Sequence, residues 1–419
     1  MPYLFGVGAV KVAPEKVAFG TKSAETPAYI ETVGRPTWDL QNEYHENSAL
    51  VQGFSKDVAG VLGVKSASTV SFPVELRGYD TGTVADAPTL AADADITPDM
   101  RLLAAGLGGV YAGGYDGTGI VELATTVSHL VVTSAASFVD GQVIIVNGEA
   151  TFVTNAITGG PETLDLGIPL SAIPTAGTKV YGTVIVYNIA GYNATYSWPL
   201  SVERLGQAAT DYTVCTGVRP SAMKISAEVG GFLTADLTLA MQSWVREDTG
   251  GAPKALTYAY PAKKIWAGGQ CVIYNITDGV RTETTCSKIE LDMGMEVSAQ
   301  KDANKVGGVA EWDKTKMQAV ITIDPLQGTE TTAAGWNFQY EAGKEYAILV
   351  QTGTTAGQIN GFVVTNCVQM ATPADADSDS KLAKALTFKT IGNDRSSVIT
   401  SDTYTDADPA DKEVLVFWG

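Results

Sequence analysis

The chain has 419 residues and a formal net charge of -18 at pH 7, with 45% hydrophobic and 18% charged residues. Its length exceeds that of one compact domain, so two or three structural units are expected. The acidic balance argues against a surface that grips nucleic acid, because phosphate binding depends on clustered Lys and Arg. The 44 glycines, with frequent Thr, Val and Ala, indicate strands and turns and therefore a mainly β fold.

The N-terminal region, residues 1–65, mixes short apolar runs with Pro14, Pro27 and Pro36. Prolines and polar breaks at this spacing favour an extended arm over a self-contained core, and such arms usually contact neighbouring molecules. The start of the chain lacks a basic segment followed by a long apolar core, so no secretory signal is expected. No apolar run approaches the length of a membrane span, and no membrane partner is expected.

Residues 66–79 predict a strand, because Val70, Phe72, Val74 and Leu76 alternate with polar residues. Proline has no N–H to donate to a neighbouring strand. The proline at position 73 therefore predicts an edge or a bulge at that point of the sheet.

One short segment predicts a helix with a flanking loop. Thr97 is a suitable N-cap, Pro98 a suitable first helical residue, and Asp99 an early acid. The predicted helix of about two turns closes at Gly106. The segment 107–120, which is rich in Gly and Tyr, predicts a loop.

Residues 121–187 predict an inserted β-module. Apolar strands in this segment are broken by Asp140-Gly141 and Asn147-Gly148, and the second pair is a strong signal for a tight turn. The sequence KVYGTVIVYN predicts a further strand that closes the module. Its short strands and small polar face favour a surface decoration. The main body is expected to consist of residues 66–120 and 188–419.

The segment 221–244 predicts a long hairpin, because its residues alternate between two faces on both sides of a turn at Gly230-Gly231. A ribbon with one dry and one wet face suits a wall rather than a catalytic cleft. The predicted apolar face consists of Met223, Ile225, Ala227, Val229, Leu233, Ala235, Leu237 and Leu239. The predicted polar face consists of Lys224, Ser226, Glu228, Thr234, Asp236 and Thr238.

The segment 286–324 repeats this pattern. The polar segment between its two strands, QKDANKVGGVAEWDK, predicts a long flexible loop. The predicted apolar face consists of Ile289, Leu291, Met293, Met295 and Val297, answered by Met317, Ala319, Ile321 and Ile323. The predicted polar face consists of Lys288, Glu290, Asp292, Glu296 and Ser298. Further strands are expected at 344–350, at 359–370 and at the C-terminus, with an acidic linker at 373–380.

Residue patterns for catalysis or cofactor binding are missing from the sequence. The only histidines, His45 and His129, cannot form a multi-histidine metal centre, whereas a His acting with a distant Cys or Ser stays open. Both are expected to be surface or satisfied polar residues. The cluster GLGGVYAGGYDG lacks the Lys-Ser/Thr of a phosphate loop, and no GxSxG elbow occurs. The stretch DADADSDS lacks the glycine and the distal Glu of an EF-hand. No enzymatic activity, cofactor or metal is therefore expected.

The four cysteines are Cys215, Cys271, Cys286 and Cys367, and none belongs to a CxxC pair. Their spacing supports neither a zinc knuckle nor a thioredoxin-like site. Buried thiols are expected, although a bridge between Cys271 and Cys286 stays open because a hairpin could bring these residues together.

The order of these parts resembles that of the tail tube proteins, also called major tail proteins, of long-tailed bacteriophages. The matching parts are the glycine-punctuated start YLFGVGAVKVAP, the edge strand TVSFPVELRGYDTG followed by TPDMRLLAAG, and the two long hairpins. Together they span about two thirds of the chain. The insert at 121–187 departs from the minimal family pattern, and in this family it would project from the outside of the tube.

The resemblance implies a β-sandwich or half-barrel with one short flanking helix, six copies of which close into a ring. Stacked rings would form the tail tube, a conduit through which DNA passes without specific binding. Implied partners are further copies of the chain, the tape measure protein, and the tail terminator and baseplate proteins. The protein would be made in the cytoplasm of the bacterial host and reside in the virion tail.

Alternation and charge select the residues expected to line the lumen. An acidic lumen repels phosphate groups, so DNA would pass without sticking. The expected lumen-lining residues are Glu228, Asp236, Glu290, Asp292 and Glu296, with Lys224 and Lys288 as partial counterweights.

Two other classes of protein share this composition. A capsid decoration or head-to-tail connector protein would also be β-rich, acidic and free of cofactors, but it would form trimers or single rings. A secreted carbohydrate-binding or adhesive β-protein would explain the Thr and Trp content. It predicts clustered exposed aromatic residues, whereas the seven tryptophans are scattered along the sequence.

Overall fold

The computed structural model describes residues 9–391 and 412–419, apart from gaps within the first range. The gaps are 26, 42–43, 52–53, 63–67, 78–96, 113–118, 124, 190–191, 193–196, 206–211, 248–265, 267–269, 285, 326–339, 341, 355–357, 372–373 and 379–380. The start YLFGVG, the Tyr-Asp-Thr-Gly after the predicted edge strand and part of the predicted 107–120 loop fall outside the described residues. No helix among the described residues is long and apolar enough to cross a bilayer.

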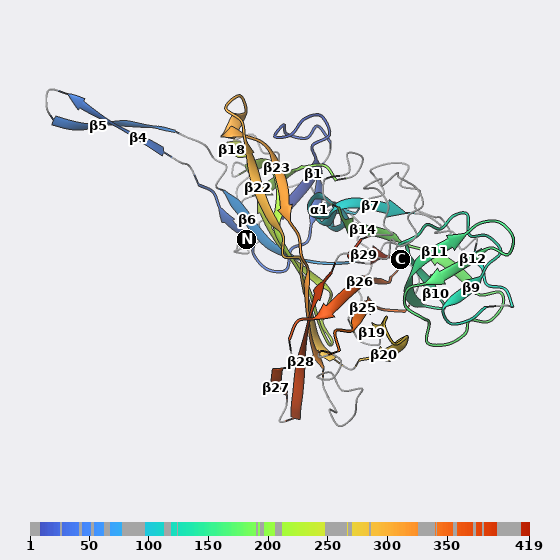
Figure 1. Ribbon diagram of the computed structural model, residues 1–419. Coiled ribbons are helices and arrows are strands. Elements are labelled where there is room, and N and C mark those ends of the chain that lie inside the picture. Colours follow the sequence, from blue (N-terminus) through green and yellow to red (C-terminus); the bar gives the residue numbers. More distant parts are fainter. Residues whose placement is uncertain are drawn as a thin grey trace, which may run out of the picture.

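The fold is mainly β, as the composition predicts, and its centre is a half-barrel of antiparallel strands (Figure 1). Each strand in this series pairs with the next, so the sheet curves continuously around one side of the core. In spatial order the strands are β3 (Thr37–Asp39), β6 (Thr69–Glu75), β17 (Thr234–Ala240), β16 (Tyr212–Glu228), β21 (Cys286–Asp292), β24 (Val320–Pro325), β28 (Lys381–Thr390) and β26 (Asn360–Gln369).

Strand β26 has neighbours on both edges, because it pairs with β25 along one edge and with β29 along the other. Almost every residue of these three strands is buried, which is the pattern of strands covered on both faces. The additional strands are β25 (Glu345–Thr352), β19 (Gln270–Asn275) and β20 (Val280–Glu283) on one side, and β29 (Val414–Trp418), β14 (Val184–Asn188) and β7 (Gly108–Ala112) on the other.

Strand β16 is long enough to belong to two sheets. Its second half lies in the half-barrel, whereas its first half pairs with strands of an upper sheet, and the register shifts between Pro220 and Ala222. The upper sheet adds β2 (Ala28–Ile30), β1 (Ala9–Pro14), β15 (Leu200–Leu205) and β18 (Ser243–Glu247). One strand thereby ties the two sheets together.

The core between these sheets contains helix α1 (Pro98–Leu107), which lies against β16, β14, β7 and β2. The helix begins as the sequence predicts, with Thr97 at the N-cap and proline at the first position. It ends one residue beyond Gly106, because Gly108 takes the left-handed conformation (φ 103°) that closes a helix. The loop predicted from 107 is therefore wrong at its start, where β7 pairs with β14.

The predicted proline effect in β6 is visible in the pairing. Pro73 faces Asp236 of β17, and its carbonyl accepts a hydrogen bond from Val33 N–H at 2.9 Å on the other side. Strand β3 pairs only with the first part of β6, up to Ser71. The β3 ladder has ended before Pro73, and the chain contacts β6 again only at the isolated bridge between Thr32 and Val74, so no β3 carbonyl faces the missing N–H.

The inserted module is a separate six-stranded sheet at one side of the half-barrel (Figure 1). Its own apolar core packs Leu130, Val153 and Leu164 together, and a second cluster joins its other face to the half-barrel. In spatial order its strands are β8 (Gly119–Ile120), β13 (Lys179–Gly182), β10 (Val143–Val146), β11 (Glu149–Ile157), β12 (Thr163–Leu166) and β9 (His129–Val131).

The sequence KVYGTVIVYN forms two strands rather than the single strand predicted. Strand β13 belongs to the insert, and β14 belongs to the half-barrel, where it pairs with β29 and β7. Thr183 lies between them, with its hydroxyl donating to Val143 O at 2.7 Å. The chain thus returns from the insert to the core at this residue, a few positions before the expected boundary at 187.

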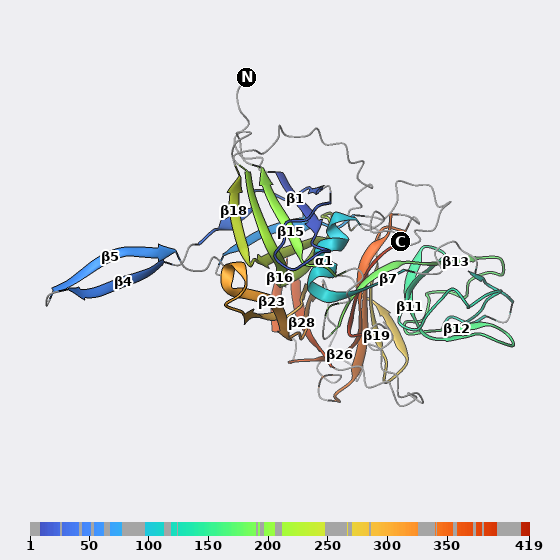
Figure 2. The ribbon, with the colours of Figure 1, turned by 90° about the horizontal axis from the view of Figure 1, so that it is seen from above.

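The N-terminal region is not a continuous arm. Strand β1 pairs with β15 and β2, and β3 pairs with β6, so these strands are parts of the body. What projects is a two-stranded hairpin, β4 (Tyr44–Val51) and β5 (Phe54–Leu62), which extends away from the body on the side opposite the insert (Figures 1 and 2).

Two segments predicted to be irregular are hairpins. The expected flexible loop between β21 and β24 contains β22 (Glu296–Lys301) paired with β23 (Val309–Lys316). The expected acidic linker at 373–380 contains β27 (Ala374–Ser378), which pairs with the first half of β28. In both segments, pairing with a neighbouring strand outweighs the weak β propensity of polar and acidic residues.

Candidate functional site

The most distinctive surface of the described residues is the side of the half-barrel that faces away from its core. Across β6, β17, β16, β21, β24 and β28, alternate residues point into the apolar core, and the residues between them form a polar surface. We call this surface the polar face. Its charged members are Glu75, Lys224, Glu228, Asp236, Lys288, Glu290, Asp292, Asp324 and Lys389.

Strand register aligns these residues in rows that cross the sheet. The longest row crosses six strands, and a second row of equal length runs beside it one pleat further along. The first row is Pro73, Asp236, Lys224, Asp292, Val320 and Lys389. The second row is Glu75, Thr234, Ser226, Glu290, Thr322 and Thr387. A shorter row is Glu228, Lys288 and Asp324.

Glu290 is the centre of the ion pairs on this face. Its carboxylate lies 2.8 Å from the Lys224 ammonium and 2.9 Å from that of Lys288, which also lies 3.6 Å from Glu228. Hydrogen bonds from the two lysines hold the pKa of Glu290 below its usual range. The same contact raises the pKa of Lys288. Because these groups are partly exposed, the pairs orient the side chains more than they stabilise the fold.

Among the described side chains the face keeps an acidic excess after these pairs are counted, since six of the charged members named above are acids and three are lysines. Glu228, Asp236 and Asp292 are exposed at the surface. Fixed carboxylates on a sheet repel polyanions and give a phosphate group no ammonium cluster to bind.

Six of the seven sequence-predicted site residues lie together on the polar face, and Glu296 does not. The predicted strand 289–297 stops at Asp292, because Gly294 (φ 54°) turns the chain, and its N–H donates to Asp292 Oδ1 at 2.9 Å. Glu296 therefore starts β22 on the separate hairpin, where it lies 2.9 Å from the Lys316 ammonium. Val229, predicted to be apolar and buried, is also exposed, because β16 ends at Glu228.

Sequence reasoning missed three charged members of the polar face: Glu75, Asp324 and Lys389. Each lies in a strand with period-two alternation, so its face could have been read from the sequence. Their grouping could not, because it depends on β6, β24 and β28 joining the same sheet as the hairpin at 221–244.

A buried charged cluster connects the β22–β23 hairpin to helix α1. The Lys314 ammonium donates to Leu107 O at 2.6 Å and to Ile189 O at 2.9 Å, and the Arg219 guanidinium donates to Ala105 O at 3.1 Å. These cations satisfy carbonyls at the C-terminal end of the helix, where positive charge is favourable. Burial, followed by repulsion from Arg219, lowers the pKa of Lys314 to about 7.

A buried carboxyl lies near the same cluster. Glu15 accepts hydrogen bonds from Ser201 Oγ and from Gly217 N–H, both at 2.9 Å. Burial nevertheless raises the pKa of Glu15 to about 7. Trp312 of the hairpin donates to Gly217 O at 2.8 Å, so the network fixes the position of the hairpin. Its groups are engaged with one another and with backbone, an arrangement typical of a structural network.

All four cysteines are buried and free, including Cys271 and Cys286, for which a bridge had stayed open. Burial raises the pKa of Cys215 to about 12, which disfavours the nucleophilic thiolate. His129 lies on the insert with its Nδ1 2.5 Å from Asp165 Oδ1. Within the described part of the chain, no three His, Cys, Asp or Glu side chains are grouped to hold a metal ion.

Comparison with known proteins gives no family assignment: no protein-family model matches the chain, and no curated protein matches it. The function of the chain is therefore inferred from its geometry and charge.

Proposed function

We propose that the chain is a structural virion protein that self-assembles into stacked hexameric rings and forms the tail tube of a long-tailed bacteriophage. The observation that carries this proposal is the polar face, a broad curved sheet with one side in the core and an acidic, register-aligned other side. A sheet with one side buried in the core and the other side wet suits the wall of a water-filled conduit.

The sign of the charge supports passage of DNA rather than its capture. A duplex carries about one negative charge per 1.7 Å, and a protein binds it by placing Lys and Arg against several phosphates. On the polar face Lys224 and Lys288 are each engaged by a carboxylate. DNA in contact with such a wall would find no binding site and would slide.

The proposal assigns the chain no catalytic role. Its partners would be further copies of itself, the tape measure protein, and the tail terminator and baseplate proteins, all by family resemblance. In this proposal the protein is made in the host cytoplasm and ends in the virion tail. The proposed lumen residues are those of the polar face, with Glu228, Asp236 and Asp292 the most exposed.

Imaging of the purified full-length chain by negative-stain electron microscopy tests the proposal. Tubes built of stacked six-fold rings are the expected result. Trimers or single rings would favour the capsid decoration or connector class instead. A protein that stays monomeric at all concentrations and salt conditions would contradict self-assembly. A density map of the tube with the Glu290 row facing outward would contradict the lumen assignment and leave the assembly intact.

A further inference from the structure

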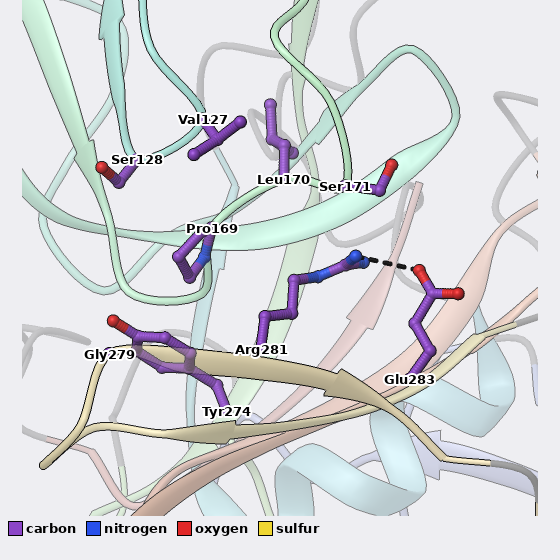
Figure 3. A pocket seen from close by; sticks show the side chains of 9 residues that line it. All are labelled: Val127, Ser128, Pro169, Leu170, Ser171, Tyr274, Gly279, Arg281 and Glu283. Atoms are coloured by element: carbon purple, nitrogen blue, oxygen red, sulfur yellow. Dashed lines mark hydrogen bonds and ion pairs between the residues drawn. The ribbon is translucent and has the colours of Figure 1, made fainter.

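An open cleft of about 660 Å³ lies where the inserted module meets the half-barrel (Figure 3). Two loops of the insert form one wall, with Ser128 on one loop and Pro169 to Ser171 on the other. The β19–β20 hairpin forms the opposite wall. Figure 3 places the Tyr274 ring at one end of the cleft, beneath Pro169, and the pair of Arg281 and Glu283 at the other end.

The polar end of the cleft is held in place by a clamp in which Arg281 and Glu149 are largely buried and Glu283 is exposed. Arg281 forms an ion pair with Glu149 of the insert through one terminal nitrogen and with Glu283 through the other, the second at 2.9 Å. Glu149 also accepts hydrogen bonds from Ser171 N–H at 3.0 Å and from Ser171 Oγ at 2.8 Å. Arg281 and Glu149 link the half-barrel to the insert and so hold the two cleft walls together, while Arg281 directs the exposed Glu283 carboxylate toward the cleft.

The aromatic end of the cleft is open on one side. Tyr274 is partly buried against the second apolar cluster, and Gly279 lies in the turn next to it. A Cβ built at Gly279 would meet only the Tyr274 hydroxyl, at 4.0 Å. The absence of a side chain at Gly279 leaves room beside the Tyr274 phenol. The backbone of Tyr274 is held on both sides by pairing with β20 and β25.

Charge decides which ligands this cleft suits. The clamp contributes one guanidinium and two carboxylates, so an anionic ligand would be repelled and would find both terminal nitrogens of Arg281 already engaged. A neutral ligand with one apolar face and several hydroxyl groups matches both ends. Its apolar face can pack on the tyrosine ring, and its hydroxyls can donate to the oriented Glu283 carboxylate.

We propose that this cleft binds a neutral hexopyranose, presented free or as part of a glycan, with Tyr274 as the stacking platform and Glu283 as the hydroxyl acceptor. Volumes in this range accommodate small ligands. The proposal is independent of the tube, since it concerns the junction between insert and half-barrel and holds equally for a monomer.

The test is saturation-transfer NMR on the full-length protein with glucose, galactose, mannose and N-acetylglucosamine as separate probes. At least one of them is expected to bind with millimolar affinity. Tyr274→Ala and Glu283→Ala are each expected to weaken that binding about tenfold. Tyr274→Phe keeps the ring and is expected to bind within about threefold of the parent. Tyr29→Ala, on β2 in the upper sheet, is the remote aromatic control and is expected to bind like the parent.

Thermal melts check that each variant folds. If Tyr274→Ala does not fold, Glu283→Ala decides the result. The proposal is overturned if none of the four sugars binds, or if Tyr274→Ala and Glu283→Ala leave sugar binding unchanged. It is also overturned if glucuronate binds more tightly than the neutral sugars, or if a lysine-rich peptide alone binds in the cleft.

Discussion

At the scale of single residues, Lys314 makes a charge-dependent contact that stability measurements can detect. Its ammonium is buried against two carbonyls at the end of α1, and its pKa is about 7 in the folded chain against 10.5 ordinarily. At pH values between about 7 and 10.5, Lys314 is protonated in the unfolded chain and mostly deprotonated in the folded chain. The contribution of Lys314 to the free energy of unfolding therefore rises with pH above about 7.

Replacing Lys314 with Met removes this contribution. The difference in unfolding free energy between the parent and Lys314→Met is expected to grow in favour of the parent from about pH 7 to about pH 9, by at most about 1.4 kcal/mol for each pH unit. Urea denaturation at a series of pH values measures it. Lys316→Met, at an exposed position on the same strand, is the matched control. A difference for Lys314→Met that is flat across this range would contradict the assignment.

At the scale of elements, Gly294 decides where β21 ends and the β22–β23 hairpin begins. It has φ 54°, and a Cβ at this position would lie 2.3 Å from Gln318 O. Gly343 has a similar φ of 62° but nothing within 4 Å of its Cβ position. Gly343→Ala is expected to lower the free energy of unfolding by about 1 kcal/mol, the cost of the left-handed backbone alone.

Gly294→Ala adds a backbone clash to the same conformational cost. The expected loss is at least about 2 kcal/mol, measured by urea denaturation of the two variants side by side. Equal losses would mean that the approach of Gln318 to Gly294 is relieved without cost.

The β4–β5 hairpin is the element most in need of a partner. A two-stranded ribbon by itself is marginally stable in water, and this one projects from the body (Figure 2). In the proposed assembly it would gain contacts with a neighbouring copy. Replacing residues 44–62 with a short Gly-Ser linker is expected to leave the thermal melt of the monomer within about 2 °C of the parent and to abolish tubes in electron micrographs. Tubes of normal length would show that the hairpin is dispensable for assembly.

At the scale of the whole molecule, the acidic excess of the polar face is the property that we expect to prevent DNA binding. Changing Glu228, Asp236 and Asp292 to Lys would reverse the sign of the face while leaving its buried side intact. The variant is expected to bind duplex DNA, with affinity that falls steeply between about 50 and 200 mM salt, whereas the parent does not bind. Fluorescence anisotropy with a labelled duplex measures both.

A control with the same net charge separates clustering from charge alone. The control variant changes Glu122, Glu162 and Glu296 to Lys, so its net charge equals that of the polar-face variant. Two of these positions lie on the insert and one lies on the β22–β23 hairpin. This variant is expected to bind DNA much more weakly, because phosphate binding requires neighbouring cations. Equal binding by the two variants would remove the special role of the polar face.

Local patterns in the sequence predicted the parts of the fold that depend on near neighbours. The helix start at Thr97, the turn at Gly230 and the faces of Lys224, Glu228 and Asp236 all follow from capping, glycine and period-two alternation. The same patterns failed at Glu296, because alternation in the sequence continues through Gly294 although the strand does not.

The sequence by itself determined the mainly β class, the acidic charge and which side of the strands at 69–75, 222–240 and 286–292 is wet, because these depend on composition and on a period of two. Only the tertiary structure decided which strands are neighbours. It placed Glu290 between two lysines, assembled nine charged residues into one face, and joined Tyr274 and Arg281 to loops of the insert. Contacts between residues distant in sequence depend on how strands pair across the sheet, and period-two alternation is the same for every possible pairing.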